Sequence, residues 1–237
     1  GQDVLLVPRW AKDRSPRIGL FAGAEFGPSK RWPWQRFAEL SRDLRRQQPA
    51  SRQIILAGPK ELWVAVRIHE ESGKIHPVVG ADLDLGQLAA VMAQLDLLVT
   101  NDSGPMHLAA AVGTPCVALF GPTDPTRTAP AGLGHEVLYT GRWCSPCFRR
   151  RCPLLHHRCL REIDVEVAAR ACRRALAAEI TGPEQQKEIA LSLLELFQAH
   201  QLPHLVEPLL QSGLEEAAGE TQQPGPLLRQ SVGADLQ

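Results

Sequence analysis

The sequence predicts an α/β fold built on a doubly wound parallel sheet, and two observations carry this prediction. Short apolar runs alternate with longer segments in which apolar residues recur every three or four positions. Glycine, proline or aspartate separates most of these segments, as is typical of loops between strands and helices. Because parallel strands need long crossover connections, the alternation predicts successive βα units with right-handed crossovers.

Each predicted strand is an apolar run that ends in a turn signal. The expected strands are residues 18–22, 53–57, 78–79, 97–100, 116–120 and 136–139. Amphipathic segments predict helices that start at Pro33, Lys60, Asp84, Pro105 and Asp164. Asp84 and Asp164 are expected to be N-caps, because a short carboxylate accepts hydrogen bonds from the free N–H groups of a first helical turn.

The composition is that of an ordinary globular protein of 237 residues, with 44% hydrophobic and 22% charged residues. The 26 basic and 26 acidic residues give a formal net charge of zero, which argues against nucleic acid as the main partner. No apolar run approaches the roughly 18 residues of a transmembrane helix. Positive charge is nevertheless concentrated in residues 142–161.

Composition also divides the chain into four parts. Residues 1–16 are expected to be an interdomain linker, and residues 17–182 carry all the predicted βα units. Residues 183–217 have amphipathic helical patterns and are expected to form a helical appendage. Residues 218–237 are rich in Gln, Gly and Pro and are expected to lack a fixed structure. Because the first residue is not Met, we expect the chain to begin inside a longer one.

Residues 99–113 combine the end of a strand, a tight turn and the start of a helix. The turn is residues 101–104, and a proline suits the first helical turn because its missing N–H would have no partner there. Helix N-termini at the carboxyl edge of a parallel sheet bind phosphate. With Asp102, Ser103 and His107 in this stretch, the sequence predicts a diphosphate site. Taken singly, the aspartate could be a cap and the histidine a partly buried helix residue.

Three further loops are expected at the same edge of the sheet. Lys30 could reach an anion as a point charge, or it could form a solvated surface pair with Arg31. Glu61 could accept the hydroxyls of a ribose, or it could simply be a first-turn carboxylate favoured by the helix dipole. Arg127 and the hydroxyls of residues 121–128 could close over a phosphate or could belong to a plain surface loop.

Two acidic residues, Asp82 and Asp84, match the Asp-x-Asp metal signature of some sugar transferases. The pair stands immediately before a predicted helix. We therefore interpret Asp84 as an N-cap and not as a metal ligand.

Four of the six cysteines lie within a stretch of 16 residues. The candidate metal ligands in this stretch are Cys144, Cys147, Cys152, Cys159, His156 and His157. A structural zinc site needs four such ligands, although the spacing is not that of a standard zinc finger. Disulfides and reduced structural thiols are the alternatives, and reduced thiols are favoured because an intracellular protein keeps its cysteines reduced.

The loops, taken in order, resemble a known family. Residues 18–33 read Ile-Gly-Leu-Phe-Ala-Gly-Ala-Glu-Phe-Gly-Pro-Ser-Lys-Arg-Trp-Pro, and residues 101–111 read Asn-Asp-Ser-Gly-Pro-Met-His-Leu-Ala-Ala-Ala. With residues 118–123, these motifs are similar to those of glycosyltransferase family 9, in particular its ADP-heptose:lipopolysaccharide heptosyltransferases of type II. The cysteine-rich loop also resembles one found in many members, and the likeness covers about residues 15–180.

The family has the GT-B fold, in which two Rossmann-like domains face each other across a cleft. The resemblance covers only the carboxyl-terminal, donor-binding domain. It implies transfer of heptose from ADP-heptose to the lipopolysaccharide inner core, without a cofactor. It also implies a cytoplasmic protein that can make peripheral contact with the inner face of the inner membrane. The acceptor site and the acidic base would belong to an amino-terminal domain, so this chain alone is expected to bind donor but to transfer sugar poorly.

The resemblance also assigns roles to individual residues. Lys30 would meet the diphosphate or the sugar, and Asp102 would contact the heptose; these two are the candidate catalytic residues. Glu61 would lie at the ribose and Leu83 at the adenine. The residues expected to hold the diphosphate are Ser103, Gly104 and His107.

Two other functions remain compatible with the sequence. The chain could be a non-catalytic nucleotide-binding module whose carboxyl-terminal helical segment docks a partner. It could also be a family 9 transferase that uses another nucleotide sugar.

Overall fold

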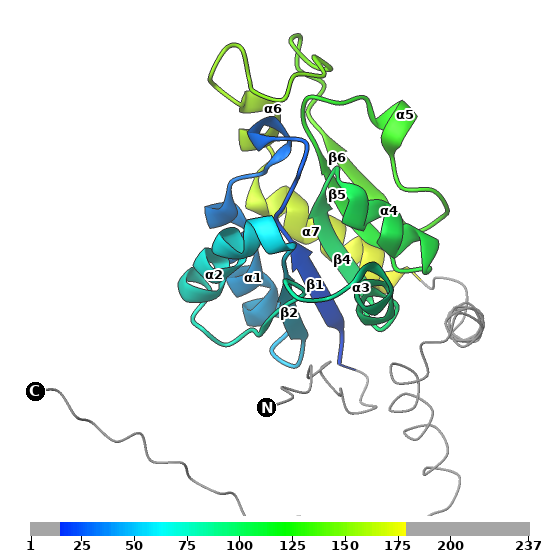
Figure 1. Ribbon diagram of the computed structural model, residues 1–237. Helices are drawn as coiled ribbons and strands as arrows, with labels where there is room; N and C mark the ends of the chain where they lie inside the picture. Colours follow the sequence, from blue (N-terminus) through cyan, green and yellow to red (C-terminus); the bar gives the residue numbers. More distant parts are fainter. Residues whose placement is uncertain (1–14, 179–237) are drawn as a thin grey trace, which may run out of the picture. The chain divides into compact units, whose positions relative to one another are not determined.

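The computed structural model describes residues 15–178 of the chain. The predicted appendage at 183–217 and tail at 218–237 lie outside the described residues, as do residues 1–14 of the predicted linker. The described part is an α/β domain in which helices cover both faces of one sheet (Figure 1). The fold class predicted from the sequence is confirmed for this part of the chain.

The sheet has six parallel strands in the order β3-β2-β1-β4-β5-β6. Their bounds are β1 Arg17–Phe21, β2 Arg52–Leu56, β3 Val78–Val79, β4 Leu97–Asn101, β5 Cys116–Phe120 and β6 Glu136–Tyr139. Every strand expected from the sequence is present, with ends shifted by at most one residue. Strands β4 and β5 are buried along their whole length, as central parallel strands are when both faces are covered.

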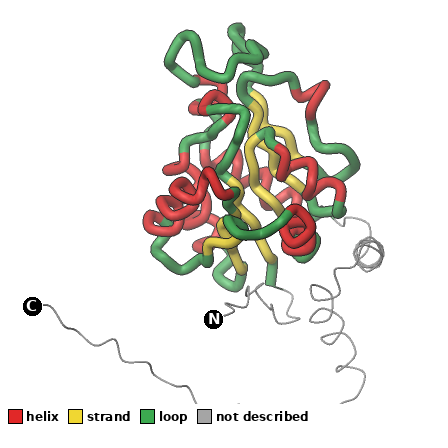
Figure 2. Tube along the Cα trace, in the orientation of Figure 1, coloured by secondary structure: helices red, strands yellow, loops and turns green. Residues whose placement is uncertain are grey.

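Five longer helices form the outer layers, and Figure 2 shows them on either side of the strands. Three of them pack over one face: α1 Trp34–Gln47, α2 Leu62–Glu71 and α7 Val165–Ala177. Two cover the other face: α3 Leu85–Met92 and α4 Gly104–Ala111. Short single turns complete the described part: η1 Pro28–Lys30, η2 Pro59–Glu61, α5 Pro125–Thr128 and α6 Arg158–Arg161.

The two predicted N-caps differ in what their side chains do. Asp84 forms a full capping box, in which its carboxylate accepts from the Gln87 N–H at 2.8 Å and Gln87 Oε1 accepts from the Asp84 N–H at 3.0 Å. Asp164 stands at the N-cap position of α7, but its side chain makes no capping hydrogen bond. It accepts instead from Arg36 Nη1 at 3.3 Å, so the predicted capping role of Asp164 is wrong.

Alternating residues of the strands supply two hydrophobic clusters, one on each face of the sheet. Ile18 and Leu20 of β1 belong to the cluster beneath α1, α2 and α7, whereas Phe21 belongs to the cluster beneath α3 and α4. A Cβ at Gly19 would lie 2.5 Å from Leu95 Cδ1, so a larger residue here would force the Leu95 side chain to shift.

The strand order creates a reversal point at the centre of the sheet. From β1 the chain proceeds outward through β2 and β3, then returns to β4 on the other side of β1. Helix α1 lies over one face and α4 over the other, so the loops after β1 and β4 diverge. Folds of this strand order bind ligands in the crevice that such a divergence opens. Lys30 follows β1 and Asp102 follows β4.

Candidate functional site

Asn101, the last residue of β4, ties the loop after β1 to the centre of the sheet. Its Oδ1 accepts from the Trp32 N–H at 3.0 Å, and its Nδ2 donates to the carbonyls of Ala22 at 2.8 Å and Gly23 at 3.3 Å. The side chain is fully buried. One amide therefore fixes both ends of the loop that carries Lys30, and it does so with both its donor and its acceptor.

Lys30 and Asp102 meet at the reversal point of the sheet. Lys30 Nζ lies 2.6 Å from Asp102 Oδ2, and the two side chains are 12% and 4% exposed. Thr123, which follows β5, donates a hydrogen bond from its hydroxyl to the same carboxylate oxygen. Three loops after three adjacent strands thus converge on one carboxylate. Two of these residues were predicted site residues, and the structure brings them into contact.

The ammonium group of Lys30 is also held from a second side. It lies 4.8 Å from the centroid of the Phe26 ring, within the range of a cation–π contact. The lysine is thus confined between an aromatic ring and a carboxylate, and the predicted alternative of a solvated surface pair with Arg31 is wrong. Arg31 donates to the Ala24 carbonyl at 3.2 Å and to Glu61 Oε1 at 3.1 Å.

The start of α4 lies directly after Asp102. Ser103 is the N-cap residue, but its hydroxyl makes no capping bond and donates to the Asn101 carbonyl at 3.2 Å. Gly104 is exposed, and a Cβ built there would find nothing within 4 Å. His107 is exposed as well. The N-terminus of this helix is therefore open to an incoming anion next to the Lys30–Asp102 pair.

Glu61 is turned towards the loop after β1. Its Oε1 accepts from the Ala24 N–H at 2.7 Å as well as from Arg31, and only 8% of the residue is exposed. A Cβ on Gly23 would lie 2.2 Å from Glu61 Oε2, so this glycine is needed for the carboxylate to approach. Glu61 thus has a structural role that the sequence did not predict, and both of these hydrogen bonds use the same oxygen.

The remaining predicted residues lie farther along the same edge. Leu83, in the loop between β3 and α3, is half-buried and packs against the cluster beneath α3 and α4. Arg127 lies in α5 with its guanidinium 5.8 Å from the Phe148 ring centroid. Residues 121–128 were predicted only as a loop; within them Asp124 caps the short helix α5 by accepting from the Thr126 N–H at 2.9 Å.

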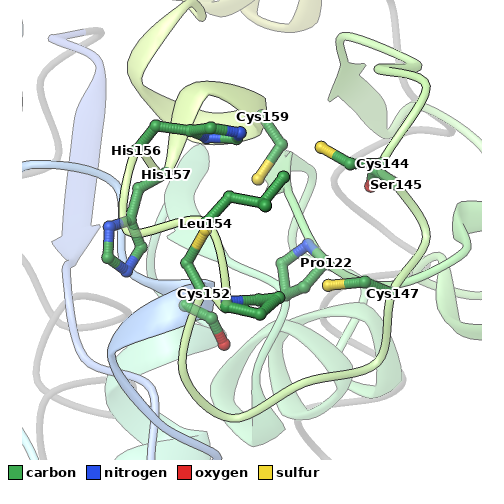
Figure 3. A pocket seen from close by; sticks show the side chains of 11 residues that line it. Pro122, Cys144, Ser145, Cys147, Cys152, Leu154, His156, His157 and Cys159 are labelled. Carbon is green, nitrogen blue, oxygen red and sulfur yellow. The ribbon is translucent and has the colours of Figure 1, made fainter.

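The four clustered cysteines line one pocket. Figure 3 shows Cys144, Cys147, Cys152 and Cys159 around it, and its void is about 20 Å³. Burial raises the pKa of the Cys159 thiol, and the three other thiols add to that shift. All six cysteines are free. Among residues 15–178, no group of three or more His, Cys, Asp and Glu side chains is arranged to hold a metal ion, so the geometry gives the zinc alternative no support.

The sequence argument missed two residues that build this site. Asn101 was interpreted only as turn chemistry, although it is the only asparagine in the chain and ends a central strand. Thr123 was one of several hydroxyls in its loop, and nothing local distinguishes it from Thr126 or Thr128. Only the parallel arrangement of β4 and β5 brings its hydroxyl to Asp102.

Comparison with known proteins adds to this geometry. A family model described as "Glycosyltransferase family 9 (heptosyltransferase)" matches residues 9–157. The chain belongs to glycosyltransferase family 9. This agrees with the resemblance carried by residues 18–33, 101–111 and 118–123.

Curated members of family 9 align with part of the chain. The lipooligosaccharide heptosyltransferase 2 of Campylobacter jejuni serotype O:2 is 34% identical over 154 residues, which are 63% of this chain and 47% of that protein. The lipopolysaccharide heptosyltransferase 2 of Escherichia coli K12 is 37% identical over 129 residues, 52% of this chain and 35% of that protein. The chain thus spans about half the length of these family members, or less.

Solved structures confirm the architecture. The Escherichia coli structure titled "ADP-heptose lps heptosyltransferase II" is 28% identical, with a TM-score of 0.59 over 70% of this chain and 48% of that one. A family 9 glycosyltransferase from Veillonella parvula is 31% identical, with a TM-score of 0.61 over 68% and 46%. The six-stranded domain therefore matches part of a GT-B heptosyltransferase. None of the helices within residues 15–178 has both the length and the apolar character needed to cross a bilayer.

Proposed function

We propose that residues 17–182 are the donor-binding half of a heptosyltransferase that transfers heptose from ADP-heptose to the inner core of lipopolysaccharide. The observation that carries this proposal is the Lys30–Asp102 pair at the reversal point of the sheet, beside the open N-terminus of α4. The names of the family 9 relatives support both the donor and the acceptor class.

In this proposal Lys30 stabilises the leaving diphosphate. Cleavage of the anomeric C–O bond passes through an oxocarbenium-like state, and negative charge grows on the departing ADP. A cation already held in place by Asp102 and Phe26 needs little reorganisation when that charge appears. Lys30 and Thr123 both contact Asp102 through Oδ2. The other carboxylate oxygen, Oδ1, takes part in neither contact and would accept a hydrogen bond from a heptose hydroxyl.

The diphosphate is proposed to lie at the start of α4. The free N–H groups and the dipole of this helix favour an anion, and the absent side chain of Gly104 gives it room. His107 would donate a hydrogen bond from one side, and the Ser103 hydroxyl would do so from the other by turning away from the Asn101 carbonyl. With Lys30 these groups would stabilise the diphosphate through charge and hydrogen bonds, and the proposed mechanism uses no cofactor.

The nucleoside is proposed to extend from the diphosphate towards β2 and β3. Glu61 would accept a ribose hydroxyl through Oε2, since the hydrogen bonds from Ala24 and Arg31 both use Oε1. Leu83, half-buried in the loop after β3, would pack against the adenine. These two assignments follow from loop position at the same edge of the sheet.

Deprotonation of the acceptor hydroxyl requires a carboxylate that faces the anomeric carbon from the acceptor side. We propose that this base and the acceptor site belong to a second, amino-terminal domain, as in other GT-B proteins. This fits a chain that spans about half the length of its relatives. The 237-residue chain is then expected to bind donor but to transfer sugar very slowly. Turnover at the rate of a full-length heptosyltransferase would contradict this.

Calorimetric titration of the chain with ADP-heptose, ADP, a UDP-sugar and a GDP-sugar tests the donor assignment. We expect ADP-heptose to bind more tightly than the other three. Equal affinity for ADP would overturn the heptose assignment and favour a non-catalytic nucleotide-binding module. Tighter binding of a UDP- or GDP-sugar would identify another donor.

A matched pair of lysine variants tests the site itself. Lys30→Ala should weaken ADP-heptose binding by about tenfold or more, the effect of losing one charge-assisted hydrogen bond. Lys74→Ala, at an exposed position after α2 on the opposite edge of the sheet, should leave the affinity unchanged. Equal effects of the two changes would show that net charge, and not this site, controls binding.

A further inference from the structure

The charged side chains around the candidate donor site cancel one another. Those of the loops after β1, β2 and β4 form three ion pairs, which are Lys30–Asp102, Arg31–Glu61 and Lys60–Glu25. Each pair joins one cation to one carboxylate, so these loops contribute no net charge. A diphosphate is an anion, and its burial in this site requires positive charge that is not already neutralised. A further cation close to the site is therefore expected.

Arg150, in the loop after β6, lies against the loop that carries Lys30. Its guanidinium carbon, Cζ, lies 5.5 Å from the centroid of the Phe26 ring, and Lys30 Nζ lies 4.8 Å from the same centroid. Both separations are within the range of a cation–π contact. One aromatic ring therefore holds two cations, and one of the two is already part of the candidate donor site.

The backbone at Arg150 is fixed to the same loop. The Ser29 N–H donates to the Arg150 carbonyl at 3.3 Å, and the Ser29 hydroxyl donates to the Arg149 carbonyl at 2.5 Å. Gly27 has φ 147°, and a Cβ there would lie 2.6 Å from the Arg150 carbonyl oxygen, so a side chain at this position would push the two loops apart. Phe26, Gly27 and Ser29 together set the place from which the Arg150 side chain extends.

Among the described residues, Arg150 has no carboxylate paired with it. The side chain is exposed, and within residues 15–178 it forms no ion pair. Its charge adds to the lowering of the Glu25 pKa, but the main cause of that shift is the hydrogen bond from Lys60, with which Glu25 is paired. The Phe26 ring attracts the guanidinium without neutralising it. Arg150 therefore supplies the uncompensated positive charge that the three ion pairs lack.

We propose that Arg150 is a further donor-binding residue, whose guanidinium pairs with the diphosphate of the nucleotide sugar. The proposal rests on the proposed function, because it takes the diphosphate to lie beside Lys30 at the start of α4. A guanidinium suits this role, since its planar N–H groups can donate to two phosphate oxygens at once. Phe26 acts as a positioning residue that holds the guanidinium beside the site.

The neighbours of Arg150 show why this arginine is singled out. Arg149 and Arg151 are also exposed and carry the same charge. Within residues 15–178, however, neither guanidinium makes a cation–π contact, whereas that of Arg150 lies over Phe26. The three consecutive arginines therefore provide matched variants that change the net charge equally and differ in their relation to the donor site.

Calorimetric titration of the 237-residue chain with ADP tests this proposal. Arg150→Gln should weaken ADP binding by about tenfold or more, the effect of losing a charge-assisted hydrogen bond. Arg150→Lys keeps the charge but not the paired donors, and should recover part of the loss. Arg151→Gln is the matched control and should bind ADP like the wild type. Added salt should weaken ADP binding less in Arg150→Gln than in the wild type, because one screened charge contact is missing.

Two variants of Phe26 test the positioning role of the ring. Phe26→Leu should weaken ADP binding by about threefold, whereas Phe26→Tyr keeps the aromatic face and should retain the affinity. Circular dichroism checks that each variant is folded. Equal affinities of Arg150→Gln and Arg151→Gln for ADP would overturn the proposal.

Comparison with Lys30→Ala separates this proposal from the proposed function. If Lys30→Ala loses ADP affinity and Arg150→Gln keeps it, Arg150 is not a donor-binding residue but the donor site stands. If the wild-type chain binds neither ADP nor ADP-heptose, both the donor site and the role of Arg150 are wrong.

Discussion

Lys30 Nζ lies 2.6 Å from Asp102 Oδ2 where the direction of strand addition reverses. Both side chains are largely buried, so the pair is shielded from water. Removing either charge would leave the other buried without a partner. The residues proposed to meet the donor are therefore also a structural link between the loops after β1 and β4.

This link predicts a strong coupling in stability. Asp102→Asn should lower the free energy of unfolding by about 3 kcal/mol, because the Lys30 ammonium remains buried without its counter-charge. The double change Lys30→Met/Asp102→Asn should cost clearly less than the sum of the two single changes. Urea unfolding of the four proteins measures the coupling. As a control, Glu25→Gln breaks the exposed pair with Lys60 and should have no measurable effect. If the losses of unfolding free energy caused by the two single changes added up in the double variant, this would be evidence against coupling between Lys30 and Asp102.

A second prediction concerns Asn101. Asn101→Ala should destabilise the domain by about 3 kcal/mol, because the Trp32 N–H and the Ala22 carbonyl lose their buried partner. ADP-heptose affinity should fall as well, since the loop that carries Lys30 loses its anchor. Asn101→Asp keeps the acceptor for the Trp32 N–H but loses the donor to the Ala22 carbonyl. Comparing the thermal unfolding of Asn101→Asp and Asn101→Ala therefore separates the contributions of the acceptor and the donor. Wild-type stability in Asn101→Ala would be the contrary result.

A third prediction concerns the stability of the domain at acidic pH. His76 is 2% exposed, its Nε2 has no hydrogen-bond partner within the described residues, and burial lowers its pKa to about 4. Arg45 and His69 add to the depression. Between pH 6.5 and 4 the unfolded chain binds a proton at this position that the folded chain does not. The stability from the neutral imidazole is thus complete above pH 6.5 and is lost as the pH falls towards 4.

The lowered pKa of His76 corresponds to about 3 kcal/mol of unfolding free energy between pH 6.5 and pH 4. His76→Phe should remove this part of the pH dependence, so the stability difference between wild type and variant should narrow or reverse as the pH is lowered from 7 to 4.5. Urea unfolding at each pH measures it. Parallel pH profiles for the two proteins would show that His76 does not titrate in this way.

A fourth prediction separates the cysteines by reactivity. Burial raises the pKa of both Cys116 and Cys172 to about 12, and both are fully buried. In the folded chain these two should resist iodoacetamide at pH 8, because the thiolate is the reactive form. The partly exposed Cys144, Cys147 and Cys152 should react first. Mass spectrometry after timed alkylation gives the order.

The same experiment decides between the alternatives for the cysteine-rich loop. Free thiols should react at the same rate with or without a chelator or a reductant. Acceleration by a chelator, together with one equivalent of zinc by elemental analysis, would establish a metal site. Acceleration by a reductant alone would indicate disulfides. Cys147→Ser serves as the control, since loss of one ligand would lower the metal content.

The strands were predictable because each is an apolar run closed by glycine, proline or aspartate. The capping box of Asp84 was also predictable, since its partner Gln87 lies three residues along the same helix. Strictly local signals of this kind determine element type. Asp164 shows their limit, because Arg36, far away in the sequence, competes for its carboxylate.

The candidate site was predictable only in part. The position of Lys30 and Asp102 at one edge of the sheet followed from the rule that parallel strands share a carboxyl edge. Their direct contact did not, because it depends on β1 lying next to β4. The inward turn of Glu61 likewise depends on Gly23, which leaves the space that its carboxylate occupies.

Ser29, which donates hydrogen bonds to the backbone carbonyls of Arg149 and Arg150, is the immediate neighbour of Lys30 in η1. One short turn of helix therefore joins the loop after β6 to the candidate donor site. A change of the backbone at Arg149 or Arg150 that alters this turn would therefore also alter how Lys30 meets Asp102.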